Sequence, residues 1–343
     1  MPCYRPLDAF QCVDGAVVFT EGKGNKRHDI SRSLLLACGQ CVGCRLERSR
    51  QWATRCIHEK QFHEEACFLT ISYDDKNLPE HRSLRHEDIQ LFLKRLRQHV
   101  VRNLPQSKTK PTKCTPPLQW GATENQGNKF PFKRRKTKLA INYVRYYMCG
   151  EYGDQTRRPH YHMCVYGWRP KDEKFWSTSR SSIQSRIYTS ATLDKIWRLG
   201  KIWIGDVTFE SAAYVARYIM KKVLGQAAAN HYTEIDASTG EIKQRNPEYT
   251  RMSLKPGIGA RWLEKYATDV YPEGKVVVRG HTSTSPKYYD KKFKKMSPLE
   301  YEDLLFERHK EQQKRPGENS KERLATKEIV AKAKIAFLKR NAH

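Results

Sequence analysis

The stretch RRPHYHMCVYG, residues 157–167, decides how the middle of this chain folds. Its run of aromatic and apolar residues after a turn is typical of a β-strand. Side chains alternate between the two faces of a strand, so His160 and His162 point to the same face while Tyr161 packs on the other. Two imidazoles on one rigid strand form a preformed pair of ligands for a divalent ion.

The residues before this strand supply further groups for such a site. The segment INYVRYYMCGEYG, residues 141–153, is predicted to be the preceding strand, and Glu151 lies near its end, where a carboxylate would complete the ligand set. The turn between the strands carries Arg157 and Arg158, where a phosphate would approach. A His-x-His pair alone is more often incidental than metal-binding, so these neighbours carry the interpretation.

A helix is predicted from ESAAYVARYIMKKVLG, residues 210–225, and Gly225 would close it. Tyr214 and Tyr218 are four residues apart and Lys221 follows three later, so all three share one helix face. A row of side chains like this is commonly a half-buried part of the core. Beside a metal site, the two tyrosines would instead act as nucleophiles, because a metal and a lysine can make a phosphodiester electrophilic and neutralise the developing charge.

The remaining regular structure is predicted from periodicity. Residues 45–63 have helical spacing, ACFLTISYDD (66–75) alternates as a strand, and residues 190–207 suggest a helix followed by a strand. Residues 83–103 form the clearest amphipathic helix. Its expected apolar face consists of Ile89, Phe92, Leu93 and Leu96.

The charge of the chain points to a polyanionic partner. Its 343 residues contain 64 Lys and Arg against 37 Asp and Glu, a formal net charge of +27. Nucleic acid is the leading candidate, because every phosphate contact releases condensed counterions. No stretch approaches the ~20 apolar residues of a membrane span, and the start MPCYRPLDAF lacks the apolar core of a secretion signal. We expect a soluble intracellular protein without a membrane partner.

Residues 104–139 are rich in Pro, Lys and Asn and are predicted to be a loop. Its basic run would follow a phosphate backbone, and three aromatic residues would stack on unpaired bases. The basic residues are Lys133, Arg134, Arg135 and Lys136, and the aromatic ones are Trp120, Phe130 and Trp168. The plain alternatives are a solvated loop and ordinary core tryptophans.

Cysteines cluster near the start of the chain. Cys38, Cys41 and Cys44 fall in CGQCVGC, a spacing suited to sharing a metal and poorly suited to pairing. A structural zinc needs a fourth ligand, for which Cys3 is favoured. An iron–sulfur cluster also uses this spacing, although the Cys-Pro that follows in bacterial ferredoxins is missing. Free buried thiols are the third alternative.

Together these segments resemble a known family. RPHYHMCVYG is similar to the His-hydrophobic-His (HUH) motif of rolling-circle replication initiators, and YVARYIMKK to their tyrosine motif in its two-tyrosine form. FLTISYDD, residues 68–75, resembles the family's first motif. The start MPCYRP and the stretch CGQCVGCRLERSRQWATRC are similar to the initiators of gokushoviruses within the Microviridae. The resemblance extends from residue 1 to about residue 222 and leaves the rest unassigned.

The resemblance implies an α/β fold of the α+β type: a central five-stranded antiparallel sheet flanked by helices, with the HUH strand central. It implies a nuclease domain at 61–225, preceded by a Cys-rich segment at 1–60. Beyond the matched motifs we expect an additional packed segment at 226–285, and the Lys/Glu-rich composition after Pro286 predicts a charged, partly helical tail at 286–343, with a loosely ordered extension as the alternative. The implied site residues follow the motifs. They are His160, His162 and Glu151 for Mg²⁺ or Mn²⁺, with Gln155 and Asp154 as rivals of Glu151, and Tyr218, Tyr214 and Lys221 for catalysis, with Lys222 as a substitute for Lys221.

The implied reaction is nicking and joining of DNA. One tyrosine displaces the 3′ oxygen at a single-stranded origin and forms a 5′-phosphotyrosine, and the free 3′-OH primes the host polymerase. After one genome length the second tyrosine acts and the displaced strand is sealed into a circle. The partners implied are viral origin DNA and the host polymerase and helicase, in the cytoplasm of a bacterial host.

Two other interpretations remain. One is a transposase or relaxase of the HUH group, although the chain lacks a helicase-like GxxxxGK[ST] segment. The other, from a different class, is a non-enzymatic zinc-dependent nucleic-acid-binding protein, for which the cysteines and the charge would suffice.

Overall fold

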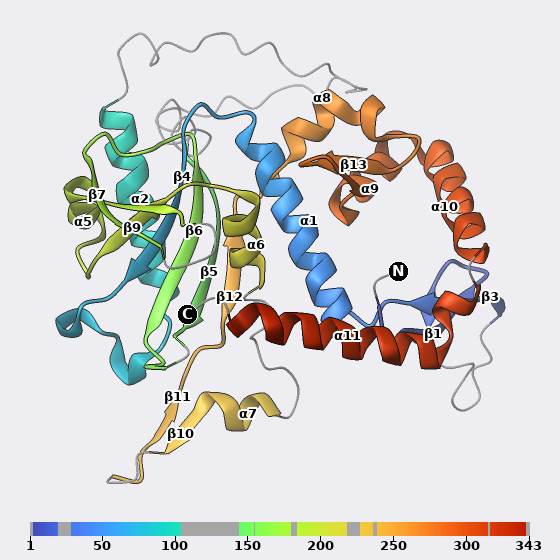
Figure 1. The fold of residues 1–343 in the computed structure, drawn as a ribbon, viewed down its shortest axis with the longest axis horizontal. Coiled ribbons are helices and arrows are strands. Elements are labelled where there is room, and N and C mark those ends of the chain that lie inside the picture. The colour runs from blue at the N-terminus through green and yellow to red at the C-terminus, as the bar shows by residue number, and fades with distance from the viewer. Residues whose placement is uncertain are drawn as a thin grey trace, which may run out of the picture.

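The computed structural model describes residues 3–19, 29–103, 144–153, 155–179, 184–217, 227–235, 239–314 and 316–340. Its centre is one large antiparallel sheet (Figure 1). The strands of this sheet are β4 (Ala66–Ser72), β5 (Arg145–Tyr152), β6 (Pro159–Tyr166), β7 (Glu173–Thr178), β8 (Arg186–Ser190), β9 (Ile202–Gly205) and β12 (Tyr249–Met252). Their spatial order is β12-β5-β6-β4-β9-β8-β7.

The sheet therefore has seven strands, and the expected five is wrong. The hairpin of β7 and β8 extends one edge, and β12 extends the other by pairing with β5. The strand with the two histidines, β6, is internal and lies between β5 and β4. Both β5 and β6 are buried almost throughout, because helices cover both faces of this part of the sheet.

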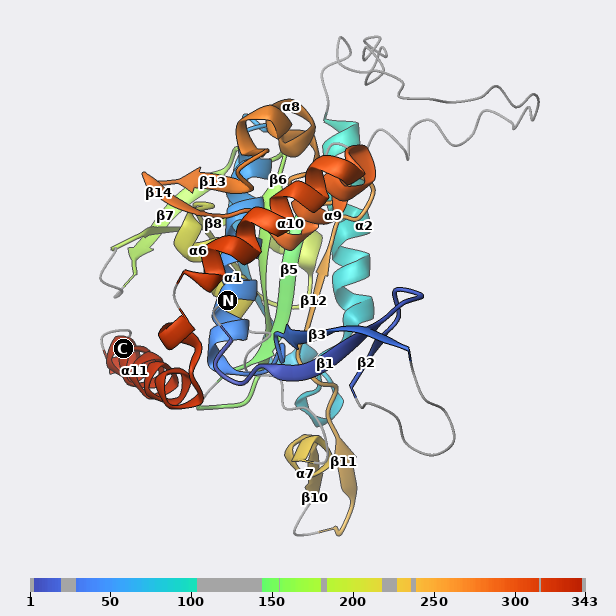
Figure 2. The same cartoon turned by 90° about the vertical axis from the view of Figure 1, so that its right-hand side faces the viewer.

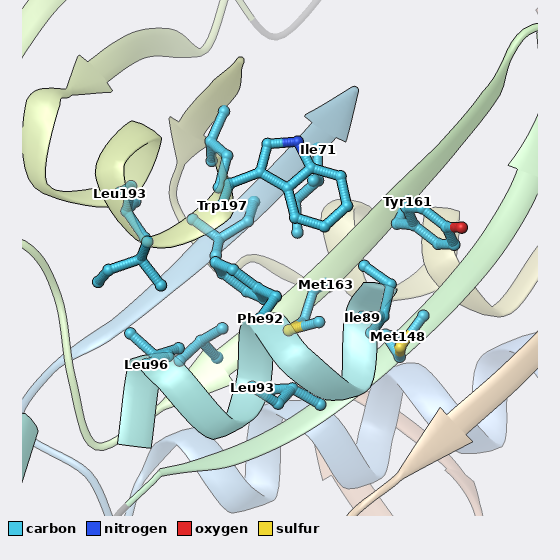
Figure 3. Packing of buried hydrophobic residues seen from close by; sticks show 14 of the residues in the cluster. Ile71, Ile89, Phe92, Leu93, Leu96, Met148, Tyr161, Met163, Leu193 and Trp197 are labelled. Carbon is cyan, nitrogen blue, oxygen red and sulfur yellow. The ribbon is translucent and has the colours of Figure 1, made fainter. Parts of the chain in front are cut away.

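One face of the sheet packs on α2 (His86–Arg102) and α5 (Ala191–Trp197). The predicted apolar side of α2 is confirmed, since Ile89, Phe92, Leu93 and Leu96 are all buried. They contact the side chains of the sheet that point to this face, and they also contact the indole of Trp197 (Figure 3). This face forms the larger of the two cores on the sheet.

The opposite face packs on α1 (Val42–Lys60) and α6 (Phe209–Arg217). Ala53 and Cys56 of α1 and Ala212 and Val215 of α6 are buried there. Small residues let the two helices approach each other and the sheet closely. Since His162 alternates toward this face, both helices lie beside the paired histidines.

Three further parts surround this centre. Near the start, β1 (Leu7–Cys12), β2 (Val17–Val18) and β3 (Ile30–Leu36) form a small sheet. A hairpin of β10 (Thr233–Ile235) and β11 (Ile242–Gln244), with α7 (Ala227–Tyr232), projects from the body (Figures 1 and 2). The last part contains α8 (Ala260–Val270), β13 (Lys275–Val278), β14 (His281–Thr284), α9 (Lys287–Met296), α10 (Pro298–Gln313) and α11 (Lys321–Arg340).

The segment after Pro286 forms helices, and the first of them, α9, is packed against other elements rather than loosely ordered. Tyr289 and Phe293 of α9 lie in a third apolar cluster with residues of α8, β13 and α10. Within the described part of the chain, no helix has the length and apolar character needed to cross a membrane.

Candidate active site

The three predicted metal ligands meet on the face of the sheet that α1 and α6 cover. In the register of β5 and β6, Glu151 pairs with His160, and Cys149 pairs with His162. The Glu151 Oε1 atom lies 2.6 Å from His160 Nε2 and 2.9 Å from His162 Nε2. Glu151 and His162 are buried, whereas about a fifth of the His160 side chain is exposed. The group is therefore reached from solvent on the His160 side.

Hydrogen bonds to the other ring nitrogens hold both imidazoles in place. His160 Nδ1 lies 3.2 Å from the Arg158 carbonyl oxygen, and His162 Nδ1 lies 3.1 Å from Thr70 Oγ1. A carbonyl only accepts, so His160 Nδ1 carries a proton and the neutral ring has its lone pair on Nε2, facing Glu151. Bonds of this kind fix the tautomer of metal-binding histidines.

In the neutral, metal-binding form of His160 the Nε2 lone pair thus faces Glu151, and a shared cation would take the place of the protons through which the two imidazoles bond to the carboxylate. Ligand atoms about 2.1 Å from an octahedral ion lie about 3 Å from each other, close to the two distances found here. Burial alone would raise the pKa of the Glu151 carboxyl, but hydrogen bonds with His160 and His162 outweigh burial and lower that pKa. The carboxylate is therefore held in its ionised, metal-binding form.

The helix α6 brings a tyrosine to this group. Its first turn is capped reciprocally, because the Ser211 N–H donates to Thr208 Oγ1 and the Thr208 N–H donates to Ser211 Oγ. Tyr214 lies on the side that faces the sheet, and its ring meets His162 edge-on with centroids 4.9 Å apart. Phe68 stacks on His162 with centroids 5.8 Å apart and meets the Tyr214 ring edge-on at 6.5 Å. A phenol therefore stands beside one of the two imidazoles.

Several predicted site residues lie outside the described residues. They are Tyr218, Lys221, its substitute Lys222, the rival ligand Asp154, the basic residues Lys133, Arg134, Arg135 and Lys136, and the aromatic residues Trp120 and Phe130. The other rival, Gln155, is exposed in the turn after β5, whereas Glu151 sits between the imidazoles. Trp168 packs against the larger core.

The two arginines of the turn differ in their surroundings. Arg157 is exposed, while Arg158 forms an ion pair with Asp75 and donates to the Tyr73 carbonyl at 3.0 Å. Asp75 ends the stretch FLTISYDD, so this ion pair ties that stretch to the loop before His160. Arg158 therefore holds the loop, whereas Arg157 faces solvent.

The four predicted cysteines also come together. The sulfur atoms of Cys3, Cys38, Cys41 and Cys44 all lie within 4.8 Å of one another. Burial would raise the pKa of the Cys41 thiol, but the Cys44 and Tyr4 N–H groups that donate to its sulfur lower the pKa to about 7. This group and the Glu–His–His group are the two sets in the described residues whose donor atoms are close enough to share a metal ion.

Sequence reasoning missed two residues of the site's face. Thr70 pairs with His162 on one side and with Trp203 of β9 on the other. The side chains of Thr70 and Trp203 therefore lie on the same face of the sheet as the Glu–His–His group. Trp203 is half-buried. Alternation along residues 66–75 could have placed Thr70 on one face, but only the strand order shows that this face holds the histidines.

Comparisons with known proteins agree with the motifs. The sequence model of the family described as replication-associated protein ORF2/G2P matches residues 122–223. The chain is 31% identical to the replication-associated protein VP4 of Bdellovibrio phage phiMH2K, over 88% of this chain and 81% of that protein. It is 27% identical to the replication-associated protein ORF2 of Spiroplasma virus 4, over 86% and 81%.

A more distant relative is the replication-associated protein ORF4 of Chlamydia phage 1, which is 25% identical over 77% of this chain and 55% of that protein. No solved structure is significantly similar to the chain. The relative from Bdellovibrio phage phiMH2K is matched over most of both chains, which confirms the resemblance drawn from the motifs. The chain therefore belongs to the replication-associated protein family of which these phage proteins are members.

Proposed function

We propose that the chain is a viral replication initiator: a metal-dependent DNA endonuclease that nicks and rejoins one strand through a tyrosine. The observation that carries the proposal is the meeting of Glu151, His160 and His162 beside Tyr214. The membership of the chain in a family of phage replication-associated proteins supports the same role. On this proposal the seven-stranded sheet is an HUH endonuclease fold with added edge strands.

The two donor sets favour different metals. One carboxylate and two imidazoles, with one side open to solvent, suit Mg²⁺ or Mn²⁺, while four thiolates favour zinc. When bound, the divalent ion would polarise the scissile phosphate. Glu151 would neutralise part of the charge of the ion, and the hydrogen bonds of His162 with the Thr70 hydroxyl and of His160 with the Arg158 carbonyl would keep the imidazoles directed at the ion.

The tyrosine supplies the covalent step. The phenolic oxygen of Tyr218 or Tyr214 attacks phosphorus, the bond from phosphorus to the 3′ oxygen breaks, and that oxygen leaves as a hydroxyl with the proton that the phenol has lost. Lys221 would neutralise the developing charge. The strand ends are then a 5′-phosphotyrosine and a 3′-OH, which the host polymerase extends with the help of a host helicase in the bacterial cytoplasm.

Two tyrosines allow the cycle to close. After one genome length the second tyrosine attacks the regenerated origin, and the newly released 3′-OH attacks the first phosphotyrosine. The displaced strand is sealed into a circle without ATP, because the phosphotyrosine has kept the energy of the broken bond. Arg157, exposed in the turn before His160, and Trp203, which pairs with Thr70 on the same face of the sheet, would contact a backbone phosphate and an unpaired base.

The decisive experiment is detection of the covalent intermediate. Full-length protein is incubated with Mn²⁺ and labelled single-stranded oligonucleotides that tile the encoding genome, and the products are separated on a denaturing gel. We expect an adduct that survives SDS. Tyr214→Phe with Tyr218→Phe abolishes this adduct, whereas either single change leaves partial nicking and blocks rejoining. An adduct of wild-type yield in the double variant would show that the nucleophile is another residue.

The same experiment separates this function from the alternatives. A non-enzymatic zinc-dependent binding protein would retard the oligonucleotides on a native gel and give no adduct under denaturing conditions. A transposase or relaxase of the HUH group would form the adduct but would not release sealed single-stranded circles from a primed circular template.

A further inference from the structure

We propose that Cys3, Cys38, Cys41 and Cys44 bind one zinc ion, and that this centre fixes the beginning of α1 and thereby the helix that carries Tyr214. The zinc site stands on its own geometry. The consequence for DNA cleavage rests on the proposed nickase function.

The spacing of the sulfur atoms suits a single tetrahedral ion. Four thiolates about 2.3 Å from zinc lie about 3.8 Å from one another. The Sγ atom of Cys3 is 3.6 Å from that of Cys38 and 3.9 Å from that of Cys41, and Cys38 is 4.0 Å from Cys44. The site therefore needs little movement to accept the ion.

Backbone N–H groups are directed at the sulfur atoms. The Cys38 N–H donates to Cys3 Sγ, the Cys41 N–H to Cys38 Sγ, and the Tyr4 N–H to Cys41 Sγ, each at 3.3 Å. Donors of this kind stabilise negative charge on sulfur, which is the form that binds metal. Thiols that were merely buried would not require such an arrangement.

Two other uses of the cysteines fit the geometry less well. A disulfide would place two sulfur atoms about 2.05 Å apart, and all four cysteines are free here. An iron–sulfur cluster binds its thiolates through several iron atoms, so it needs the sulfur atoms farther apart than a single ion does. One tetrahedral ion accounts for all four positions.

The N-terminal segment has little else to hold it. In its small sheet the buried residues are Ala9 and Cys12, while Leu7, Val17 and Leu35 are between 45% and 54% exposed. A segment with so small an apolar core cannot offset the conformational entropy that it loses on folding. Metal binding supplies this free energy in small domains of the same kind.

The centre is joined directly to α1. Cys41 caps the helix, its sulfur accepting from the Cys44 N–H, and Cys44 lies in the first turn. The zinc would therefore link the start of the chain, the residues after β3 and the beginning of α1. Figure 2 shows the small sheet lying at this end of the helix.

From there α1 holds α6 at two points. Ser49 Oγ donates to the Ala213 carbonyl at 3.0 Å, and Lys60 Nζ donates to the Val207 carbonyl, just before α6, at 2.7 Å. Ala213 is the neighbour of Tyr214 in the chain. Displacing the first half of α1 would release the contact closest to the tyrosine, while the carboxylate and imidazoles on β5 and β6 would keep their positions.

The first test measures metal in the full-length wild-type protein. We expect one zinc per chain by elemental analysis and four sulfur neighbours in its X-ray absorption spectrum. Cys44→Ser should lose the zinc, while Cys12→Ser, a buried cysteine of the same segment outside the group, should keep it. Substoichiometric zinc in the wild type, or iron in its place, would overturn the proposal even if no variant could be purified.

The second test measures the link to α6 by hydrogen exchange and Mn²⁺ affinity. In Cys44→Ser, amide exchange should accelerate in α6 and the first half of α1, with α2 and β6 unchanged and Mn²⁺ bound as tightly as in the wild type. Unchanged exchange in α6 would refute the positioning role. These readouts do not depend on DNA cleavage, so failure of the nickase proposal would be seen separately, as absence of the covalent adduct in a zinc-replete wild type.

Discussion

The Glu151 carboxylate is the residue on which the proposed metal site depends. It lies between two imidazoles whose other nitrogens are already engaged by the Arg158 carbonyl and the Thr70 hydroxyl. Buried charges are retained in proteins when they are paired or bind a metal. Glu151 satisfies this condition most simply with a divalent ion shared by His160 and His162.

Glu151→Gln should therefore abolish metal binding. The amide keeps the size of the side chain but removes the negative charge, and we expect a loss of Mn²⁺ affinity above about 100-fold, since even outer hydrogen-bond partners of ligands cost 10–100-fold. Titration followed by Mn²⁺ electron paramagnetic resonance measures this affinity. Gln155→Ala is the matched control and should bind as the wild type does, whereas the reverse order of the two affinities would assign the third ligand to Gln155.

Thr70→Val should weaken the same site without removing a ligand. The valine cannot bond to His162 Nδ1, so the imidazole loses its orientation, and the Mn²⁺ concentration for half-maximal binding should rise by about 10-fold. Thr70→Ser keeps the hydroxyl and should restore wild-type binding. Equal effects of the serine and valine variants would mean that packing, and not the hydrogen bond, is the role of Thr70.

At the residue scale, local pattern was enough to bring the proposed ligands together. The period of two along β6 placed His160 and His162 on one face, and a short turn brought Glu151 opposite them. Thr70 and Trp203 were not predicted, because their place beside the site depends on the order of β4 and β9 in the sheet, which no local pattern contains.

Among the elements, α1 joins the parts of the molecule. Its Glu59 forms a buried ion pair with Arg145 of β5 and accepts from the Gly259 N–H, just before α8, at 2.7 Å. Its His58 stacks on Trp262 of α8 with centroids 3.5 Å apart and bonds to the Tyr289 hydroxyl through Nδ1 at 2.9 Å. The helix therefore contacts the sheet and the C-terminal cluster as well as α6.

The burial of His58 predicts a dependence of stability on pH. Burial lowers the pKa of this imidazole to about 3, whereas the unfolded chain protonates it near pH 6.5. Between these values the unfolded state binds more protons, so stability falls as the pH falls, by about 2 kcal/mol from pH 7 to pH 5. Urea unfolding at the two pH values should show this loss.

The control for this prediction removes the titrating group. His58→Phe keeps a flat ring against Trp262 but cannot be protonated, so its loss of stability between pH 7 and pH 5 should be smaller by about the same 2 kcal/mol. Identical pH dependence in the two proteins would mean that His58 does not remain neutral in the folded chain.

Element prediction succeeded where an element packs against a core. The apolar stripe of α2 and the alternation of β4 are periodic, while β5 and β6 are near-continuous apolar and aromatic runs because both of their faces are covered. The hairpin β7–β8 was missed, because Phe175 and Trp176 are both exposed and the register shifts between Phe175 and Ser177. Without clean alternation, this edge hairpin is not visible in the sequence.

For the whole molecule, the net charge of +27 predicts salt-dependent binding of single-stranded DNA. The logarithm of the association constant should fall linearly with the logarithm of salt concentration, with a slope of about −0.7 per phosphate contact. Arg157→Ala should reduce this slope by about 0.7 in fluorescence anisotropy titrations. Trp203→Ala, which removes a stacking surface and no charge, should lower the affinity and leave the slope unchanged.

If the salt dependence has the same slope in Arg157→Ala and in the wild type, Arg157 does not contact a DNA phosphate. Lys334→Ala, on the exposed side of α11, provides a comparison in which charge is lost far along the chain from the site. Composition alone predicted a polyanionic partner. It could not say which of the 64 basic residues meet the DNA, since that depends on the face to which each one is brought.

The proposed tyrosine chemistry is decided by the identity of the residue that becomes linked to DNA. The covalent adduct formed with Mn²⁺ is digested with protease and nuclease, and the modified peptide is sequenced by mass spectrometry. We expect a 5′-phosphodeoxynucleotide on Tyr214 or Tyr218, formed by the wild type and lost in Glu151→Gln. A linkage to any residue outside 209–225 would contradict this mechanism. So would an adduct that forms equally well without the Glu151 carboxylate.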